Sequence, residues 1–314
     1  MRILLTGVSG FAGSALLPRL LDEGHDVRAL GRDPERVEQT LASMAGPGLS
    51  DFELVVGDAL AGTSMRRAMK GVEVAYYLIH SMEPSPGEPF GERERIAAAT
   101  FARAARIAGV RRIVYLGGLL PRDQPASHHL SSRHAVERIL LDALPDSVAL
   151  RASIVIGARS RSFRFLVRLV ERLPVLTLPA WRRFRTQPID ERDVVEMLAA
   201  AATAPSVAGR ALDIGGPDVL TYNEIVERIA DLMLLGRPTI GLGVTLTPIA
   251  ARLAAVLTDE SPELVLPLME GLTGDLLPAD HHAAEIFKVD LHSFDSAVEH
   301  ALYEWEKLEP LAAR

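Results

Sequence analysis

Three glycines near the N-terminus have the spacing of a phosphate-binding turn. Gly7, Gly10 and Gly13 stand three residues apart, between the apolar run Ile3–Leu5 and a helical pattern. In such a turn one glycine makes the tight bend, another lets the backbone approach a pyrophosphate, and the third lets helix and strand pack closely. The phosphates then rest on free N–H groups at the positive end of the helix. The turn predicts dinucleotide binding, although similar glycine triplets also occur where no ligand binds.

A histidine and an arginine four residues apart, His129 and Arg133, could carry acid–base chemistry. On a helix that begins before His129, both side chains share one face. An imidazole can donate or accept a proton near neutral pH. A guanidinium stays charged and can hold a ribose or a substrate anion. The alternative is structural, with His129 flanking the helix start and Arg133 paired with Glu137.

The residues after the second predicted strand bear on the choice between NADP and NAD. Arg32 follows Gly31 at the strand end, where a guanidinium suits the 2′-phosphate of NADP(H). Asp33 could instead accept from the 2′-hydroxyl of NAD(H), but Asp33-Pro34 is also a helix start with an aspartate N-cap. We therefore expect NADP(H) to be preferred over NAD(H). Asp58, after the third strand, is expected to contact adenine, with a turn-capping role as the alternative.

The remaining candidates come from the ends of the predicted strands. The predicted cofactor residues are Thr6, Gly7, Ser9, Gly10, Phe11, Gly13, Arg32, Asp58, Ala59, Leu78, His80 and Arg133. The predicted catalytic residues are His129 and Arg133. His281 and His282 lie near Asp280 and Glu285, but a surface helix start explains this cluster better than a metal site does. No metal is expected.

Short apolar runs alternate with longer amphipathic patterns over the first 155 residues, which predicts a doubly wound parallel α/β sheet covered on both faces. The predicted strands are Arg2–Thr6, Asp26–Leu30, Phe52–Val56, Val72–Ile79, Arg112–Leu116 and Val148–Ile154. The helical patterns begin near Phe11, Pro34, Ser64, Gly91 and Leu130.

The alternation weakens after Gly157. We expect a nucleotide-binding domain over 1–155 and a smaller substrate lobe over 156–314, with 186–203 packing back on the first domain. The elements predicted there are helices at Arg159–Arg172, Glu191–Thr203 and Thr221–Leu235, a strand at Leu212–Gly216, and a proline-punctuated segment at Leu173–Pro179.

The composition of the chain argues against several classes of function. The net charge of −7 argues against a nucleic-acid partner, because phosphate backbones need clustered excess Lys and Arg. The chain has no cysteine, which excludes thiolate chemistry and disulfides and fits a cytoplasmic protein. The N-terminal run is predicted to be a strand rather than a signal peptide. The apolar stretch from Gly241 to Leu257 contains Arg252 and is too short to span a membrane. It is expected to be a buried helix, with a membrane-surface helix as the alternative.

Together these residues resemble the atypical NAD(P)H-binding branch of the extended short-chain dehydrogenase/reductase superfamily, in particular its NmrA-like and complex-I-accessory-like members. The likeness covers most of the chain and is carried by the glycine turn and by the segments 75–82, 108–118, 150–157 and 187–194. It implies a Rossmann sheet. Typical members use a Tyr-x-x-x-Lys pair and a serine. Here His129 and Arg133 stand at the Tyr and Lys places, and Gly117-Gly118 stands at the serine place.

The resemblance leaves two function classes open. One is an NADPH-dependent reductase of a small, apolar or quinone-like carbonyl compound, with His129 as proton donor. The other is a non-catalytic NADP(H) sensor or accessory subunit, which the loss of Ser and Tyr favours. Sugar-nucleotide epimerase or dehydratase chemistry fits less well without the Tyr-x-x-x-Lys pair. The sequence favours an enzyme and leaves the oligomeric state open. Apolar residues that could contact the substrate, or simply fill the core, are Phe163, Phe165, Leu166 and Leu169.

Overall fold

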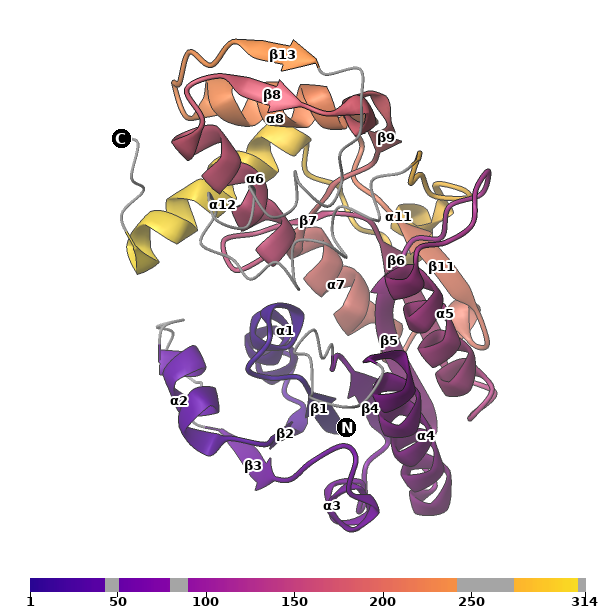
Figure 1. Cartoon of the computed structure of the whole chain (residues 1–314). Helices are drawn as coiled ribbons and strands as arrows, with labels where there is room; N and C mark the ends of the chain where they lie inside the picture. The colour runs from indigo at the N-terminus through magenta and orange to yellow at the C-terminus, as the bar shows by residue number, and fades with distance from the viewer. Residues whose placement is uncertain (43–50, 80–89, 242–273, 310–314) are drawn as a thin grey trace.

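The computed structural model describes residues 1–42, 51–79, 90–241 and 274–309 of the 314-residue chain. Within these ranges seven parallel strands form one sheet in the order β11-β6-β5-β4-β1-β2-β3 (Figure 1). The order reverses between β1 and β4, so a crevice opens there at the carboxyl ends of the strands. The strands are β1 (Arg2–Thr6), β2 (Asp26–Gly31), β3 (Phe52–Val56), β4 (Val74–Tyr77), β5 (Arg112–Gly118), β6 (Val148–Ala152) and β11 (Ala211–Ile214).

Helices cover both faces of the sheet because successive strand side chains point to opposite sides. In β1, Ile3 and Leu5 pack in one core cluster, and Leu4 packs in the other. The first cluster includes residues of α1 (Phe11–Asp22), α2 (Pro34–Ala42), α7 (Glu191–Ala201) and α11 (His282–Phe287). The second includes residues of α3 (Gly62–Ala68), α4 (Phe90–Ala108) and α5 (His128–Leu141). The result is the predicted α/β architecture.

A third cluster forms the core of the upper part of the molecule in Figure 1. It joins α6 (Arg161–Arg172), α8 (Tyr222–Leu232) and α12 (Phe294–Leu308) around Trp305, whose side chain is fully buried. Short two-stranded ladders surround it. These are formed by β7 (Val155–Ile156) with β10 (Ile189–Asp190), β8 (Leu176–Leu178) with β13 (Thr239–Gly241), and β9 (Arg185–Thr186) with β12 (Leu220–Thr221).

Three segments from beyond residue 155 join the sheet part of the molecule, and one of them, α11, packs on the other two, α7 and β11. Helix α7 packs on α1, and β11 pairs in parallel with β6 as an edge strand. The strand itself is predicted from the sequence, but its pairing with β6 is not. The division of the chain into domains at residue 155 stays a prediction.

Several element boundaries differ from the sequence expectation for local reasons. Strand β6 ends at Ala152 rather than Ile154, because Ser153 Oγ donates to Gln187 O at 2.7 Å where the chain leaves the sheet. Helix α6 begins at Arg161 rather than Arg159, because the Ser160 side chain is its N-cap. The segment 173–179 contains strand β8, which depends on a partner more than fifty residues away. Of the apolar stretch 241–257, all but Gly241 lies outside the described residues.

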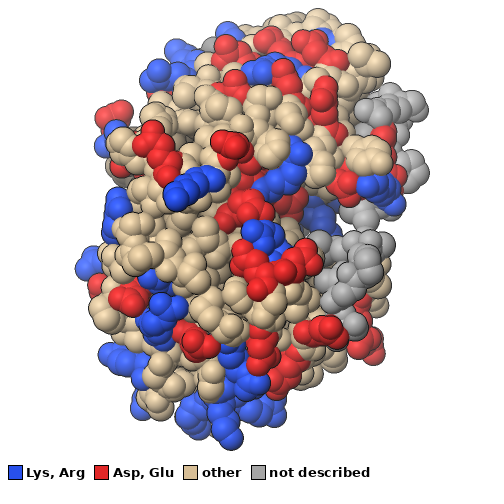
Figure 2. Space-filling view, turned by 180° about the vertical axis from the view of Figure 1, so that it is seen from behind, with Lys and Arg blue, Asp and Glu red and all other residues tan. Residues whose placement is uncertain are grey.

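The surface carries charges of both signs. On the face shown in Figure 2, acidic and basic side chains intermix over most of the area. Such mixing is typical of a solvated surface. No helix in the described part of the chain is both long and apolar enough to cross a membrane.

Candidate functional site

A pocket of about 1030 Å³ opens at the carboxyl end of the sheet, where the strand order reverses. Its walls come from the β1–α1 turn, the ends of β2, β4 and β5, helix α5, and the start of α6. Ten of the predicted site residues line it together: Gly7, Ser9, Gly10, Phe11, Arg32, Asp58, Ala59, Leu78, His129 and Arg133. Of the others, Thr6 and Gly13 lie behind the wall, and His80 lies outside the described residues.

The glycine turn needs its first and third glycines for packing. Gly7 has φ +73°, and a Cβ there would lie 2.4 Å from the carbonyl oxygen of Leu78. A Cβ on Gly13 would lie 2.3 Å from the carbonyl oxygen of Gly7. Gly10 is exposed and is the N-cap of α1 without a side-chain cap, so the first N–H groups of the helix face the pocket side. This bare, positive helix end fits the pyrophosphate of a dinucleotide.

Thr6 holds the two strands that flank the crevice. Its Oγ1 donates to Tyr76 O at 2.8 Å and accepts from Leu78 N at 3.2 Å. The hydroxyl is fully buried behind the turn. Thr6 therefore shapes the site by tying β1 to β4, and its side chain has no path to a ligand.

The residues predicted to set cofactor specificity line the end of the pocket that follows β2. Arg32 and Arg36 are both exposed and line the pocket. Asp33 Oδ1 accepts from Arg36 N at 3.1 Å, so the predicted capping role of Asp33 is confirmed. Arg36 was not predicted as a site residue. Its position four residues after Arg32, about one helical turn, indicated that both side chains could reach the same place. Nearby, Asp58 Oδ1 accepts from Leu60 N at 2.9 Å and so holds its own turn.

Helix α5 supplies His129 and Arg133. Ser127 caps the helix and accepts from Leu130 N, so α5 begins at His128 and the two side chains share a face. The alternative pairing of Arg133 with Glu137 is wrong, because Glu137 accepts from Arg151 at 2.6 and 2.7 Å. Burial is the main cause that lowers the pKa of His129, and the charge of the adjacent His128 lowers it further.

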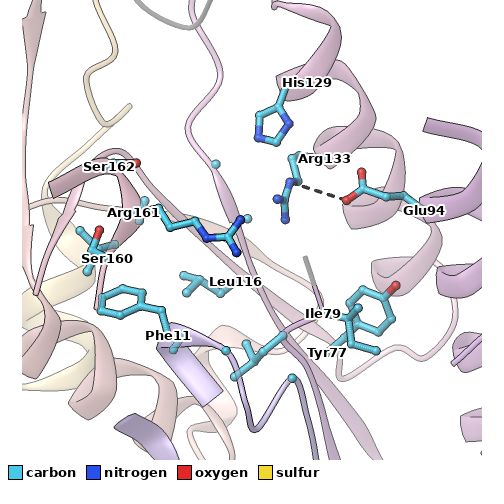
Figure 3. Close-up of a pocket in the computed structure, with 18 of the residues that line it drawn as sticks. Phe11, Tyr77, Ile79, Glu94, Leu116, His129, Arg133, Ser160, Arg161 and Ser162 are labelled. Carbon is cyan, nitrogen blue, oxygen red and sulfur yellow. Dashed lines mark ion pairs between the residues drawn. The ribbon is translucent and has the colours of Figure 1, made fainter. Parts of the chain in front are cut away.

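A buried carboxylate, Glu94 of α4, stands beside this pair (Figure 3). Ser132 Oγ donates to its Oε2 at 2.7 Å, and Arg133 Nε lies 3.9 Å from its Oε1. Burial raises the pKa of Glu94 to about 7. Glu94 was not predicted from the sequence. The signal was a glutamate on the apolar face of a helix, three residues before Ala97 and seven before Phe101.

The opposite wall is the start of α6. Ser160, Arg161 and Ser162 line the pocket there and are labelled in Figure 3. Of the four apolar residues proposed for substrate contact, Phe165 and Leu166 line the pocket, and all four belong to the core of this lobe. Arg159 Nη1 lies 3.4 Å from Ser14 Oγ and thus joins this wall to α1.

The histidines near the C-terminus belong to a surface helix, as expected. His281 is the N-cap of α11, and His282 N donates to Asp280 Oδ1 at 3.2 Å. The side chains of His282 and Glu285 are largely exposed. Within the described residues no group of three potential ligands is placed to hold a metal ion.

Comparison with known proteins assigns the chain to a family. Residues 7–154 match the model of an NAD(P)H-binding family. The chain is 30% identical to the (4-alkanoyl-5-oxo-2,5-dihydrofuran-3-yl)methyl phosphate reductase of Streptomyces griseus subsp. griseus, over 75% of this chain and 74% of that one. The chain belongs to the atypical, NmrA-like NAD(P)H-binding branch of the short-chain dehydrogenase/reductase superfamily.

Two further relatives show the range of this family. The ceramide reductase of Caulobacter vibrioides is 27% identical over 74% of this chain and 70% of its own length. A mitochondrial NADH dehydrogenase [ubiquinone] 1 alpha subcomplex subunit 9 of Arabidopsis thaliana is 25% identical over 72% of this chain and 56% of its own. The relatives of this chain therefore include two proteins named as reductases and one named as a subunit of an NADH dehydrogenase.

Solved structures confirm the fold. The UDP-glucuronic acid 4-epimerase from Bacillus cereus in complex with NAD superposes with a TM-score of 0.72, covering 100% of this chain and 99% of that one. The sequence identity is 16%. This likeness establishes the Rossmann-type fold and carries no information on the substrate of this chain.

Proposed function

We propose that this protein is an NADP(H)-dependent reductase of a small carbonyl compound. One observation carries the proposal: a single pocket runs from the glycine turn to His129 and Arg133, and continues to apolar residues of the α6 wall. A cofactor bound on the turn and a substrate bound beside α5 would therefore share one cavity. The two relatives named as reductases support this reaction class.

The residues of the turn and of the adjoining strand ends would hold the cofactor. The N–H groups at the start of α1 would bind the pyrophosphate, and Arg32 with Arg36 would bind a 2′-phosphate. Asp58 and Ala59 would contact the adenine, and Leu78 would line the nicotinamide side. Arg133 would clamp the ribose or a substrate anion. When bound, NADPH supplies a hydride to the carbonyl carbon.

His129 is the proposed proton donor to the carbonyl oxygen. The resemblance puts His129 at the place of the family's tyrosine, and its presence in the pocket lining supports this role. Its pKa is lowered, so the imidazolium is a stronger acid than usual but is populated only below the ordinary range near pH 6.5. We therefore expect kcat to fall as pH rises through that lowered pKa.

A non-catalytic NADP(H)-binding accessory protein is the second candidate. The respiratory-complex subunit among its relatives favours it. So do Gly117 and Gly118, which line the pocket and which the resemblance puts at the place of the family's serine. In this case the cofactor would stabilise the fold without turning over.

Paired titrations with NADPH and NADH, read as thermal shifts, test the cofactor. At a ligand concentration of about 100 times Kd the folded state gains roughly 2.7 kcal/mol, so a bound cofactor is easily seen. We expect a clear shift with NADPH and a smaller one with NADH. Arg32→Ala should erase that difference, whereas Arg66→Ala, which removes an exposed arginine away from the pocket, should preserve it. An unchanged NADPH affinity in Arg32→Ala would refute the specificity assignment.

Turnover decides between the two candidates. We expect NADPH oxidation with members of a carbonyl and quinone panel, and a loss of about 100-fold or more in kcat for His129→Phe, given the usual contribution of a general acid. NADPH binding should survive this substitution. Tight cofactor binding with no turnover on any panel member would favour the accessory role. Full turnover in His129→Phe would remove the histidine from the mechanism.

A further inference from the structure

Arg133 is a buried cation whose hydrogen-bonding groups are not used by the protein. It exposes only 8% of its surface. Its guanidinium makes no hydrogen bond with any residue in the described part of the chain, and its Nε is fully buried without a partner. The nearest acid, Glu94, stays 3.9 Å away and has its other oxygen bound by Ser132. Burying a charge without hydrogen bonds is costly, so such a group points to a ligand that completes it.

Arg161 brings a second guanidinium into the same cavity from the opposite wall. It is the first residue of α6 and is exposed to the pocket. Figure 3 shows its side chain reaching across the cavity above Leu116, toward Arg133. Two like charges that converge in a partly enclosed space repel each other, and an anion between them converts the repulsion into attraction.

The end of α6 adds to the positive potential. Ser160 accepts from Phe163 N, which leaves the N–H groups of Arg161 and Ser162 without intrahelical partners. The helix dipole places partial positive charge at this point. Among the described residues that line the pocket, only Asp58 and Glu94 are acidic, and Asp58 belongs to the adenine end. The wall between α5 and α6 is therefore strongly cationic in a chain whose net charge is −7.

We propose that Arg133 and Arg161 form a two-arginine clamp for an oxyanion on the substrate, so that the substrate is a carbonyl compound bearing a carboxylate or phosphate group. This inference rests on the proposed reductase function. The apolar lining, which includes Ile79, Leu116 and Phe165, would hold the body of such a molecule. Arginine suits both anions, because its planar fork binds carboxylate or phosphate through two hydrogen bonds.

Matched aldehydes provide the test. Binding to the NADP⁺-saturated protein would be measured calorimetrically for two pairs of aldehydes, each with an anionic and a neutral member. In the carboxylate pair these are 4-carboxybenzaldehyde and its methyl ester. In the phosphate pair they are 4-formylphenyl phosphate and 4-methoxybenzaldehyde. Initial rates with NADPH would be measured in parallel. We expect one or both anions to bind at least about tenfold more tightly than their neutral counterparts, as charge-assisted hydrogen bonds would give. The more strongly preferred anion identifies the group. Added salt should weaken the binding of the anionic aldehydes and leave the binding of the neutral ones unchanged.

Three substitutions refine the test. Arg133→Met and Arg161→Met should each reduce the affinity for the preferred anion by about 10- to 100-fold, with little effect on the neutral aldehyde. Arg172→Met removes the same charge from the far end of α6 and should change nothing. NADPH affinity should stay the same in Arg161→Met. If Arg161→Met reduced the affinity for NADPH as strongly as the affinity for the anion, the two arginines would bind the cofactor and the inference would fail.

The outcomes separate this inference from the proposed function. Anions that bind through both arginines but are never reduced would support the clamp and count against the reductase. Anionic and neutral aldehydes reduced with equal kcat/KM would support the reductase and overturn the clamp. Equal affinities in the unmodified protein, or no measurable binding of either anion, would overturn the clamp without any variant having to fold.

Discussion

Two buried arginines occupy opposite ends of the sheet and have opposite surroundings. Arg112, at the start of β5, exposes 1% of its surface, and its Nη1 donates to the carbonyl oxygens of Ala201 at 2.6 Å and Ala204 at 2.8 Å. Arg133, in α5 at the carboxyl end, exposes 8% and makes no side-chain hydrogen bond within the described residues. Both lose hydration, and the Nε of each is buried without a partner, but only Arg112 recovers hydrogen bonds from the protein, through its Nη1.

The difference separates structural from ligand-binding cations. Arg112 closes the end of α7 onto the sheet, so its donors satisfy carbonyl groups that would otherwise be buried without partners. Arg133 keeps its donors directed at a cavity, and burial lowers its pKa to about 10. A protein retains such a costly arrangement where a ligand offsets it. Burial alone therefore does not distinguish the two roles, whereas the destination of the N–H groups does.

The largest expected effect is on Arg112. Arg112→Met should destabilise the fold by about 3 kcal/mol, because one buried and one partly buried carbonyl group lose their donor at roughly 1–3 kcal/mol each. Urea unfolding measures the loss. NADPH affinity per folded molecule should not change, since Arg112 is remote from the pocket lining. If the free energy of unfolding fell by less than about 1 kcal/mol, these hydrogen bonds would not stabilise the fold, and Arg112 would not differ from Arg133 in this respect.

The next effect concerns Glu94, the acid beside Arg133. Its pKa in the folded protein is raised to about 7 by burial, so the folded state favours the protonated carboxyl. The unmodified protein should lose stability as pH rises from about 4.5 to above 7, because the unfolded chain ionises first. Glu94→Gln mimics the protonated form and should gain about 2 kcal/mol relative to the unmodified protein at pH 8 and almost nothing at pH 5. Unfolding curves at the two pH values measure this. A variant less stable at pH 8 would mean that the ion pair of Glu94 with Arg133 outweighs the cost of burying the carboxylate.

The smallest expected change in stability is that of Arg133→Met in the absence of ligands. Replacing a poorly satisfied buried charge by an apolar side chain of similar length is often neutral or stabilising, so we expect a change within about 1 kcal/mol. The same urea unfolding as for Arg112→Met makes the two variants a matched pair. Equal destabilisation of both would indicate that Arg133 serves the fold as Arg112 does.

The candidate site could be predicted only in part. The glycine turn, the Asp33 cap and the shared helix face of His129 and Arg133 are local features, and each follows from residues within a few positions of one another. Glu94 and Arg161 were not predicted as site residues. They reach the pocket through packing between segments far apart in the chain. Glu94 is marked locally only by its place on the apolar face of its helix, and nothing near it in sequence shows that α5 and α6 meet it at a pocket.

The sequence by itself determined the alternation of strands and helices, the dinucleotide turn and the family. These depend on period-two and period-3.6 apolar patterns and on backbone positions that only glycine tolerates, such as Gly7. The tertiary structure alone decided that β11 extends the sheet beside β6, that α6 faces α5 across a pocket, and that Arg133 is buried without a hydrogen-bond partner among the described residues. Those outcomes depend on which distant surfaces meet and on what each buried polar group finds there, and short-range patterns do not encode either.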